Sequence, residues 1–94
     1  MKNGEYIEYY GSGEIFFKIN YLDGKKHGEY INYYRCGLIS IKCWYLGGGL
    51  HGECIHYFTN GELNYKSYYI NGVDVTKLEW ISYNRNLKLE LIGL

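Results

Sequence analysis

The feature of the chain that most limits its fold is a segment that recurs every 24 residues, starting at positions 4, 28 and 52. It reads Gly-Glu-Tyr-Ile-Glu-Tyr-Tyr from Gly4, Gly-Glu-Tyr-Ile-Asn-Tyr-Tyr from Gly28 and Gly-Glu-Cys-Ile-His-Tyr-Phe from Gly52. A fixed period of this length is typical of repeat architectures, which present extended surfaces and seldom enclose catalytic clefts. The period therefore predicts one domain and does not favour an enzyme. The domain would span 1–94, with repeats over 4–27, 28–51 and 52–75.

Two series of glycines mark turns at the same period. Asp23-Gly24 and Asn71-Gly72 lie between apolar and aromatic runs, as do Ser12-Gly13 and Asn60-Gly61. Such pairs suit two-residue hairpin turns with positive φ at both central residues. We therefore predict a mainly β fold, namely a single-layer twisted antiparallel meander of three β-hairpin repeats with a short C-terminal capping helix. The turn glycines are Gly13, Gly24, Gly37, Gly48, Gly61 and Gly72, and the strands would cover 5–10, 14–22, 26–34, 38–46, 50–58 and 62–70.

The turns also predict which side chains share a face of the sheet. If every turn has two residues, Tyr10 faces Ile15, Glu8 faces Phe17, and Phe17 faces Tyr30 on the next hairpin. Because side chains alternate along a strand, one face is then strongly apolar and aromatic. That face would carry Tyr6, Tyr10, Ile15, Phe17, Ile19, Tyr21, Tyr30, Tyr34, Ile39, Ile41, Cys43, Tyr45, Cys54, Phe58, Leu63, Tyr65 and Tyr69.

The other face mixes charged residues with isoleucine and tyrosine. In the same register Glu29 would lie opposite Lys18, and Glu53 opposite Lys42. Cross-strand pairs of opposite charge contribute roughly 0.2–1 kcal/mol each. Their recurrence once per repeat supports the register.

The repeat pattern ends after Gly72. Thr76 followed by Glu79 matches a capping box, which satisfies free amide groups at a helix start. We expect a helix over about 77–84 within a C-terminal cap of residues 76–94, which would cover the last strand. Beyond Asn84 the leucines fit both a strand and a helix, and both alternatives stay open.

Charge and composition exclude several classes of partner. Ten basic and ten acidic residues give a formal net charge of zero, so the chain lacks the basic surface that nucleic acid requires. No apolar run approaches the ~20 residues of a membrane helix, so no membrane insertion is expected. Met1-Lys2-Asn3-Gly4 contains no apolar signal core, which favours a cytoplasmic location. The odd number of cysteines, three, favours free thiols in a reducing compartment.

The candidates for metal binding and catalysis are weak. Cys43, Cys54 and His56 could approach one another on adjacent strands, but a fourth zinc ligand is missing from that face. No metal or cofactor is therefore expected within one chain, although a zinc site shared by two chains stays open. His27 and His51 each precede a recurring glycine and are interpreted as strand-entry residues.

A longer motif follows each recurring segment. It is Tyr-Tyr-x-x-Gly-x-Ile and then Tyr-x-x-Gly-Lys, and it reads Tyr9-Tyr10-Gly11-Ser12-Gly13-Glu14-Ile15 and Tyr21-Leu22-Asp23-Gly24-Lys25 in the first copy. Over residues 4–73 this pattern resembles the MORN repeat (membrane occupation and recognition nexus). Two departures are Gly48-Gly49, where a lysine would follow the glycine, and Cys54, where the other copies have tyrosine.

The MORN resemblance implies an elongated, curved antiparallel sheet that serves protein–protein contact. The ending Gly72-Val73-Asp74-Val75-Thr76-Lys77 is similar to that of arrays in giant viruses that infect amoebae. A viral protein of this kind would work in the host cytoplasm or the virion.

We therefore expect a protein–protein interaction and scaffolding module. It would use the aromatic face and the open strand 5–10, with self-association as a homodimer. Alternatives are a groove for a carbohydrate or lipid and a weak enzyme, for which Glu8, His56 and Ser67 are the polar groups on the aromatic face. The candidate partner-binding residues are Tyr6, Tyr10, Tyr21, Tyr30, Tyr34, Tyr45, Tyr65 and Tyr69.

Overall fold

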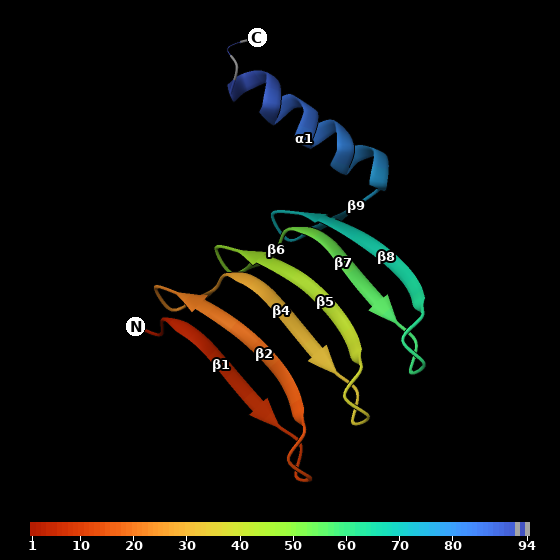
Figure 1. The fold of residues 1–94 in the computed structure, drawn as a ribbon. Helices are drawn as coiled ribbons and strands as arrows, with labels where there is room; N and C mark the ends of the chain where they lie inside the picture. Colours follow the sequence, from red (N-terminus) through yellow and green to blue (C-terminus); the bar gives the residue numbers. More distant parts are fainter. Residues whose placement is uncertain (92, 94) are drawn as a thin grey trace.

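One open antiparallel sheet followed by one helix makes up the fold (Figure 1). The computed structural model describes residues 1–91 and 93. Within them nine strands form the sheet in the order β1-β2-β4-β5-β7-β8-β9, with β3 paired to β2 and β6 to β5. The predicted mainly β fold with a C-terminal helix is confirmed. The elements are β1 (Gly4–Tyr9), β2 (Ile15–Leu22), β3 (Lys25–Lys26), β4 (Gly28–Tyr33), β5 (Ile39–Leu46), β6 (Gly49–Leu50), β7 (Gly52–Tyr57), β8 (Leu63–Ile70), β9 (Val73–Val75) and α1 (Lys77–Leu91).

Gly24, Gly48 and Gly72 form the two-residue hairpin turns that the sequence predicts. Asp23 and Gly24 have φ of 51° and 81°, and Asn71 and Gly72 have φ of 49° and 83°. The middle turn, at Gly48, also has positive φ at both central positions. Because the tightest hairpin turn requires this conformation twice in succession, aspartate or asparagine followed by glycine fits it.

Gly13, Gly37 and Gly61 end three-residue loops, so the prediction of two-residue turns is wrong at these three positions. The Gly13 N–H donates to the Tyr10 carbonyl oxygen (3.0 Å), and the Tyr10 N–H donates to the Glu14 carbonyl oxygen (2.8 Å). The same pair of hydrogen bonds recurs at the loops of Gly37 and Gly61. In this loop only the final glycine needs the left-handed conformation, and Gly13 has φ of 103°.

A β-bulge beside each three-residue loop restores the predicted register further along the hairpin. Glu8 lies opposite Phe17 as predicted, but Tyr9 lies opposite Ile15, which leaves Phe16 as the extra residue. The predicted partner of Ile15 is therefore wrong, and its side chain belongs with Tyr9 on the mixed face. The same correction applies to Ile39 and Leu63, which lie opposite Tyr33 and Tyr57.

The register between hairpins differs from the prediction by two residues. Phe17 lies opposite Asn32 instead of Tyr30, and the corresponding shift occurs between β5 and β7. The cause is an irregularity where β3 passes into β4, because residues 27–30 span the length that two residues span on β2. Because the shift is even, every side chain outside the loop-proximal bulges stays on its predicted face.

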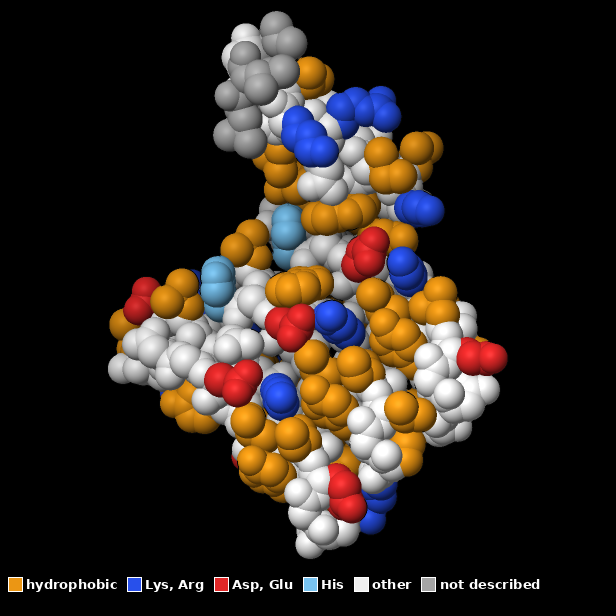
Figure 2. Space-filling view, in the orientation of Figure 1, with side chains coloured by type: hydrophobic (Ala, Val, Ile, Leu, Met, Phe, Trp, Pro, Cys, Tyr) orange, Lys and Arg blue, Asp and Glu red, His pale blue; other side chains and the backbone are white. Residues whose placement is uncertain are grey.

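The ion pairs of the mixed face follow the observed register. The predicted opposition of Glu29 and Lys18 is wrong, and that of Glu53 and Lys42 is wrong as well. Lys42 instead lies 3.5 Å from Glu29, and Lys66 lies 3.8 Å from Glu53, both diagonally across the hairpin that contains them. Acidic and basic side chains lie among hydrophobic ones on the surface in Figure 2.

Helix α1 begins as predicted and extends further than predicted. The Glu79 N–H donates to Thr76 Oγ1, and the Thr76 N–H donates to Glu79 Oε1, each at 3.1 Å, so the capping box is confirmed. The helix continues past 84 to Leu91, whereas residues 92 and 94 of the predicted cap lie outside the described residues. Trp80 and Tyr83 contact His51 near the helix start, and the C-terminal part of α1 points away from the sheet (Figure 1).

Candidate interaction surface

Aromatic rings contact one another across one side of the sheet, which we call the aromatic face. Tyr6 packs edge-on against Tyr21, with ring centroids 5.3 Å apart. Phe17 lies 6.0 Å from Tyr30, and Tyr30 lies 6.1 Å from Tyr45. These pairs connect β1, β2, β4 and β5, and their separations lie in the range that favours aromatic pairing.

A large part of the aromatic face is open to solvent. Tyr6 is 41% exposed, Phe16 38% and Tyr65 51%. The buried hydrophobic side chains of the described residues are limited to Ile19, Cys43, Cys54 and Tyr68, and none of them is completely buried. This small core follows from the architecture, because a sheet without a second layer cannot enclose its own side chains.

Cationic side chains lie over some of these rings. Lys2 Nζ is 5.0 Å from the centroid of Tyr21, and Lys26 Nζ is 5.2 Å from that of Tyr45. Arg35 lies 5.0 Å from the Tyr10 ring. Such distances allow a favourable cation–π interaction. The aromatic face therefore combines exposed rings with basic groups at its rim.

Two of the candidate tyrosines are held within the chain. The Tyr10 hydroxyl donates to the Tyr33 carbonyl oxygen at 2.6 Å, and the Tyr34 hydroxyl donates to the Tyr57 carbonyl oxygen at 2.7 Å. Each bond joins one hairpin to the next, so these hydroxyls stabilise the array. Of the other candidates, Tyr6 and Tyr65 are exposed and Tyr21, Tyr30, Tyr45 and Tyr69 are half-buried.

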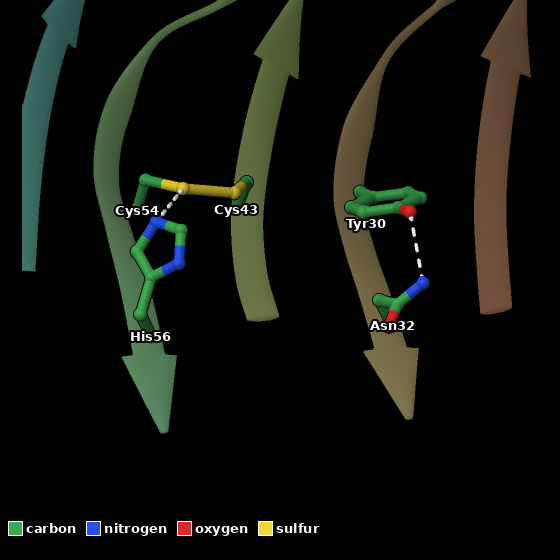
Figure 3. Close-up of a disulfide and its surroundings, with 5 residues drawn as sticks. All are labelled: Tyr30, Asn32, Cys43, Cys54 and His56. Atoms are coloured by element: carbon green, nitrogen blue, oxygen red, sulfur yellow. Dashed lines mark hydrogen bonds between the residues drawn. A yellow bond between two sulfur atoms is a disulfide. The ribbon is translucent and has the colours of Figure 1, made fainter. Parts of the chain in front are cut away.

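Cys43 and Cys54 form a disulfide between β5 and β7 (Figure 3), so the prediction of free thiols is wrong for these two residues. Their Cα atoms are 4.3 Å apart. His56 lies beside them, with Nε2 3.6 Å from Cys54 Sγ, and its ring stacks on Tyr65 at 4.2 Å. Cys36 is exposed and free in the described part of the chain.

The two-residue register shift explains why sequence reasoning missed the disulfide. The predicted register placed Cys43 opposite Gly52 and diagonal to Cys54, whereas the observed register places the two cysteines face to face. Ile19 and Tyr30 occupy the corresponding positions 24 residues earlier. The sequence signal that could have revealed the disulfide is that cysteine replaces both of these residues in the next repeat.

The candidate zinc ligands Cys43, Cys54 and His56 contact other side chains of the protein. Cys43 and Cys54 bond to each other, and His56 packs on Tyr65. Among the described residues no group of three or more His, Cys, Asp or Glu side chains could hold a metal ion.

His27 and His51 enter strands, as predicted. Each lies directly before a strand, β4 or β7. His51 Nδ1 accepts a hydrogen bond from the Asn71 N–H at 3.2 Å, and Asn3 Oδ1 accepts the corresponding bond from Asp23 at 2.9 Å. The imidazole of His51 thus bonds the turn at Asn71 and also packs against Trp80 of α1.

The polar residues suggested for an enzyme or ligand groove are not gathered into one site. Glu8 is on β1 and His56 is on β7, with β2, β4 and β5 between them in the sheet, whereas Ser67 is on β8 opposite Cys54. No pocket is found in the region that the structure describes. Within residues 1–91 and 93, no helix has the length and apolar character needed to span a bilayer.

Comparisons of the chain with protein-family models, with curated proteins and with solved structures found no match. The MORN resemblance therefore rests on the motif alone, and function is argued from the geometry of the surface.

Proposed function

We propose that this protein is a protein–protein interaction and scaffolding module that binds through its aromatic face and the outer edge of β1. The observation that carries the proposal is a set of ring contacts on the aromatic face in which Tyr6, Phe16 and Tyr65 are exposed. Tyr6 packs on Tyr21, Phe16 packs on Phe17, and Tyr65 stacks on the imidazole of His56. Tyrosine and other aromatic residues are enriched at protein contacts because they bury a large area at low entropic cost. A partner that covers this face would provide the second layer that the described sheet lacks.

The β1 edge offers a second means of contact. β1 pairs with β2 on one side, and no described strand pairs with its other side. Addition of an extended segment to such an edge is a common mode of recognition, in which backbone hydrogen bonds provide affinity. We propose that one partner is a second copy of the chain, which makes a homodimer the smallest assembly.

The MORN-like motif supports the same class of function, and we propose that the chain is a variant of that repeat. The absence of a pocket in the described region favours a macromolecular partner over a small ligand. The formal charge of zero does not favour an acidic lipid surface.

Substitution of exposed rings tests the proposal. In Tyr6→Ser/Tyr65→Ser two exposed rings of the aromatic face are lost, whereas in the control Trp44→Ser an equally exposed ring of the mixed face is lost. Affinity purification from cells of the source should recover a partner with the wild-type chain and with Trp44→Ser but not with the double variant. Equal recovery by all three proteins would reject the aromatic face as the binding surface.

Light scattering coupled to size-exclusion chromatography tests self-association separately. We expect the average mass of the wild-type protein to rise with concentration in the micromolar range. A monomer at every concentration would reject the homodimer and leave the purification test unaffected.

A further inference from the structure

The outer side of β1 and the first half of β8 are open strand edges within the described residues. The outer side of β1 pairs with no described strand, and β9 covers β8 only along Tyr68–Ile70. The first half of β8 is correspondingly exposed, with Leu63 at 52%. Each of these edges therefore presents backbone N–H and C=O groups that another strand can pair with.

The chain contains a template for the pairing of these two edges. Between β2 and β4, Lys18 lies opposite Ile31, and the corresponding lysine and isoleucine lie opposite each other between β5 and β7. On β8 the corresponding lysine is Lys66, and on β1 the corresponding isoleucine is Ile7. The lysine–isoleucine pair that joins successive hairpins within the chain can therefore also form between Lys66 of one copy and Ile7 of another.

The backbone direction of β1 suits this pairing. The Tyr10 N–H and C=O both bond across the β1–β2 hairpin, to Glu14 and Gly13. Because backbone groups alternate in direction along an antiparallel strand, Ile7 and Tyr9 direct theirs to the open side.

The backbone direction of β8 suits it as well. On β2 the Asn20 carbonyl oxygen accepts a hydrogen bond from His27 at 2.9 Å, so Asn20 and, by alternation, Lys18 direct their backbone groups toward β4. Lys66 stands at the position of Lys18 and therefore directs its N–H and C=O toward the open edge.

We propose that copies of the chain associate head to tail, with β1 of one copy extending the sheet along the first half of β8 of another. Ile7 then pairs with Lys66, and Glu8 lies beside Tyr65. This inference rests on the proposed function in that it names the strand that the β1 edge recognises. Because the contact is heterologous, each added copy leaves one edge of each kind free, and the dimer is the first step of an open-ended assembly.

Helix α1 leaves the required part of β8 accessible. It starts after Thr76, and its first turns contact His51, which precedes β7 and lies beside the end of β8 where β9 is paired. Leu63 lies at the opposite end, beside a three-residue loop, and Figure 1 shows α1 directed away from the sheet. The in-chain template needs only two residue pairs, both in the accessible half.

Charge favours the head-to-tail contact over a symmetric β1–β1 dimer. A symmetric dimer brings the Glu5 and Glu8 carboxylates of both copies to one seam, and like charges there are unfavourable. The head-to-tail contact instead places Lys66 of β8 beside the acidic β1 strand. Each head-to-tail contact also covers one β1 edge and one β8 edge, whereas the symmetric dimer leaves the β8 edge of both copies uncovered.

Proline substitution on each edge distinguishes these arrangements. Ile7→Pro removes an outward N–H from β1, and Lys66→Pro removes one from β8; proline is tolerated on an edge strand where the N–H faces solvent. By sedimentation equilibrium each variant alone should associate roughly tenfold or more weakly than wild type, and an equimolar mixture should recover a 1:1 dimer through the intact edges. Association of Lys66→Pro alone at the wild-type level, or a mixture that stays monomeric, would overturn the proposal.

Phe58→Tyr provides a variant that should strengthen the contact. Tyr10 and Tyr34 donate hydroxyl hydrogen bonds to the following hairpin, and Phe58 occupies the next position in that series without a hydroxyl. In the head-to-tail contact the new hydroxyl would reach the Tyr9 carbonyl oxygen of the second copy. We expect association to tighten by roughly two- to tenfold with unchanged unfolding of the monomer. Unchanged association would contradict the register.

Amide NMR of the wild-type protein on dilution tests the inference without any variant. Head-to-tail pairing shifts the amide resonances of Ile7, Glu8, Tyr65 and Lys66 together, whereas a β1–β1 dimer shifts those of β1 alone. A dilution series with no shifts and a constant monomer mass would overturn this inference and the homodimer. It would not affect the proposal for the aromatic face, which is tested separately by affinity purification.

Discussion

The Tyr34 hydroxyl donates a 2.7 Å hydrogen bond to the Tyr57 carbonyl oxygen and so ties the middle hairpin to the last one. Tyr34→Phe removes this bond and leaves the ring in place. We expect the free energy of unfolding to fall by about 1 kcal/mol, the usual net value of such a bond, when it is measured by urea denaturation. Tyr9→Phe is the matched control, because the Tyr9 hydroxyl has no hydrogen-bond partner among the described residues. An equal loss in both variants would show that the Tyr34 bond does not stabilise the array.

The disulfide predicts both a thiol count and a stability effect. Under non-reducing, denaturing conditions, titration with a thiol reagent should detect Cys36 alone, and after reduction all three cysteines. Cys43→Ser/Cys54→Ser should lower the free energy of unfolding by roughly 2–3 kcal/mol, because the closed loop is short. Three reactive thiols before reduction would contradict the disulfide.

Local signals predicted the two-residue turns and the helix start, because each depends on a few adjacent residues. Asp23 and Gly24 determine their turn through backbone conformation alone. Thr76 and Glu79 satisfy each other's backbone amides within one helical turn. Neither feature requires knowledge of the neighbouring strands.

Pairing between hairpins was not predictable in the same way. The irregular segment 27–30, most of which is the start of β4, has two residues more than the part of β2 that it faces, and no turn motif marks it. A shift of two residues leaves each side chain on the same face of the sheet. The composition of the aromatic face could therefore be predicted, whereas the residues that lie opposite each other on neighbouring hairpins could not. The Cys43–Cys54 pair and the ion pair of Glu29 with Lys42 were missed for this one reason. The expectation of a reducing compartment loses its basis with the disulfide.

Strand β9 was missed although the 24-residue period contains it. Val73 and Asp74 stand at the positions of Lys25 and Lys26, which form β3. The helix beyond Asn84 stayed ambiguous because alternating leucines fit a strand as well as a helical stripe. Only the structure shows that α1 extends to Leu91.

The capping box should control how much of α1 is helical. Thr76→Ala removes the acceptor for the Glu79 N–H, and such changes cost about 1 kcal/mol of helix stability. Because most of α1 lies away from the sheet, we expect a loss of helical signal in far-UV circular dichroism with little change in the β signal. Ser82→Ala, at an exposed position inside the helix, is the control and should not reduce helicity. Unchanged helicity in Thr76→Ala would show that the cap is not required.

Glu14, in the first three-residue loop, should have a pKa below its ordinary value. The Ser12 hydroxyl donates to the Glu14 carboxylate, and together with the backbone N–H of Glu14 and the positive charge of Arg35 it holds the pKa of that carboxyl below its ordinary value, despite slight desolvation. A depressed pKa means that the loop's contribution to stability is complete above the unfolded-state pKa and disappears as the pH falls through the folded-state pKa. Ser12→Ala should therefore move the Glu14 titration midpoint upward in carboxyl-detected NMR. Arg35→Gln should move it upward by less, since the charge of Arg35 is the weaker cause. An unmoved midpoint in Ser12→Ala would show that the hydroxyl does not stabilise the ionised carboxylate.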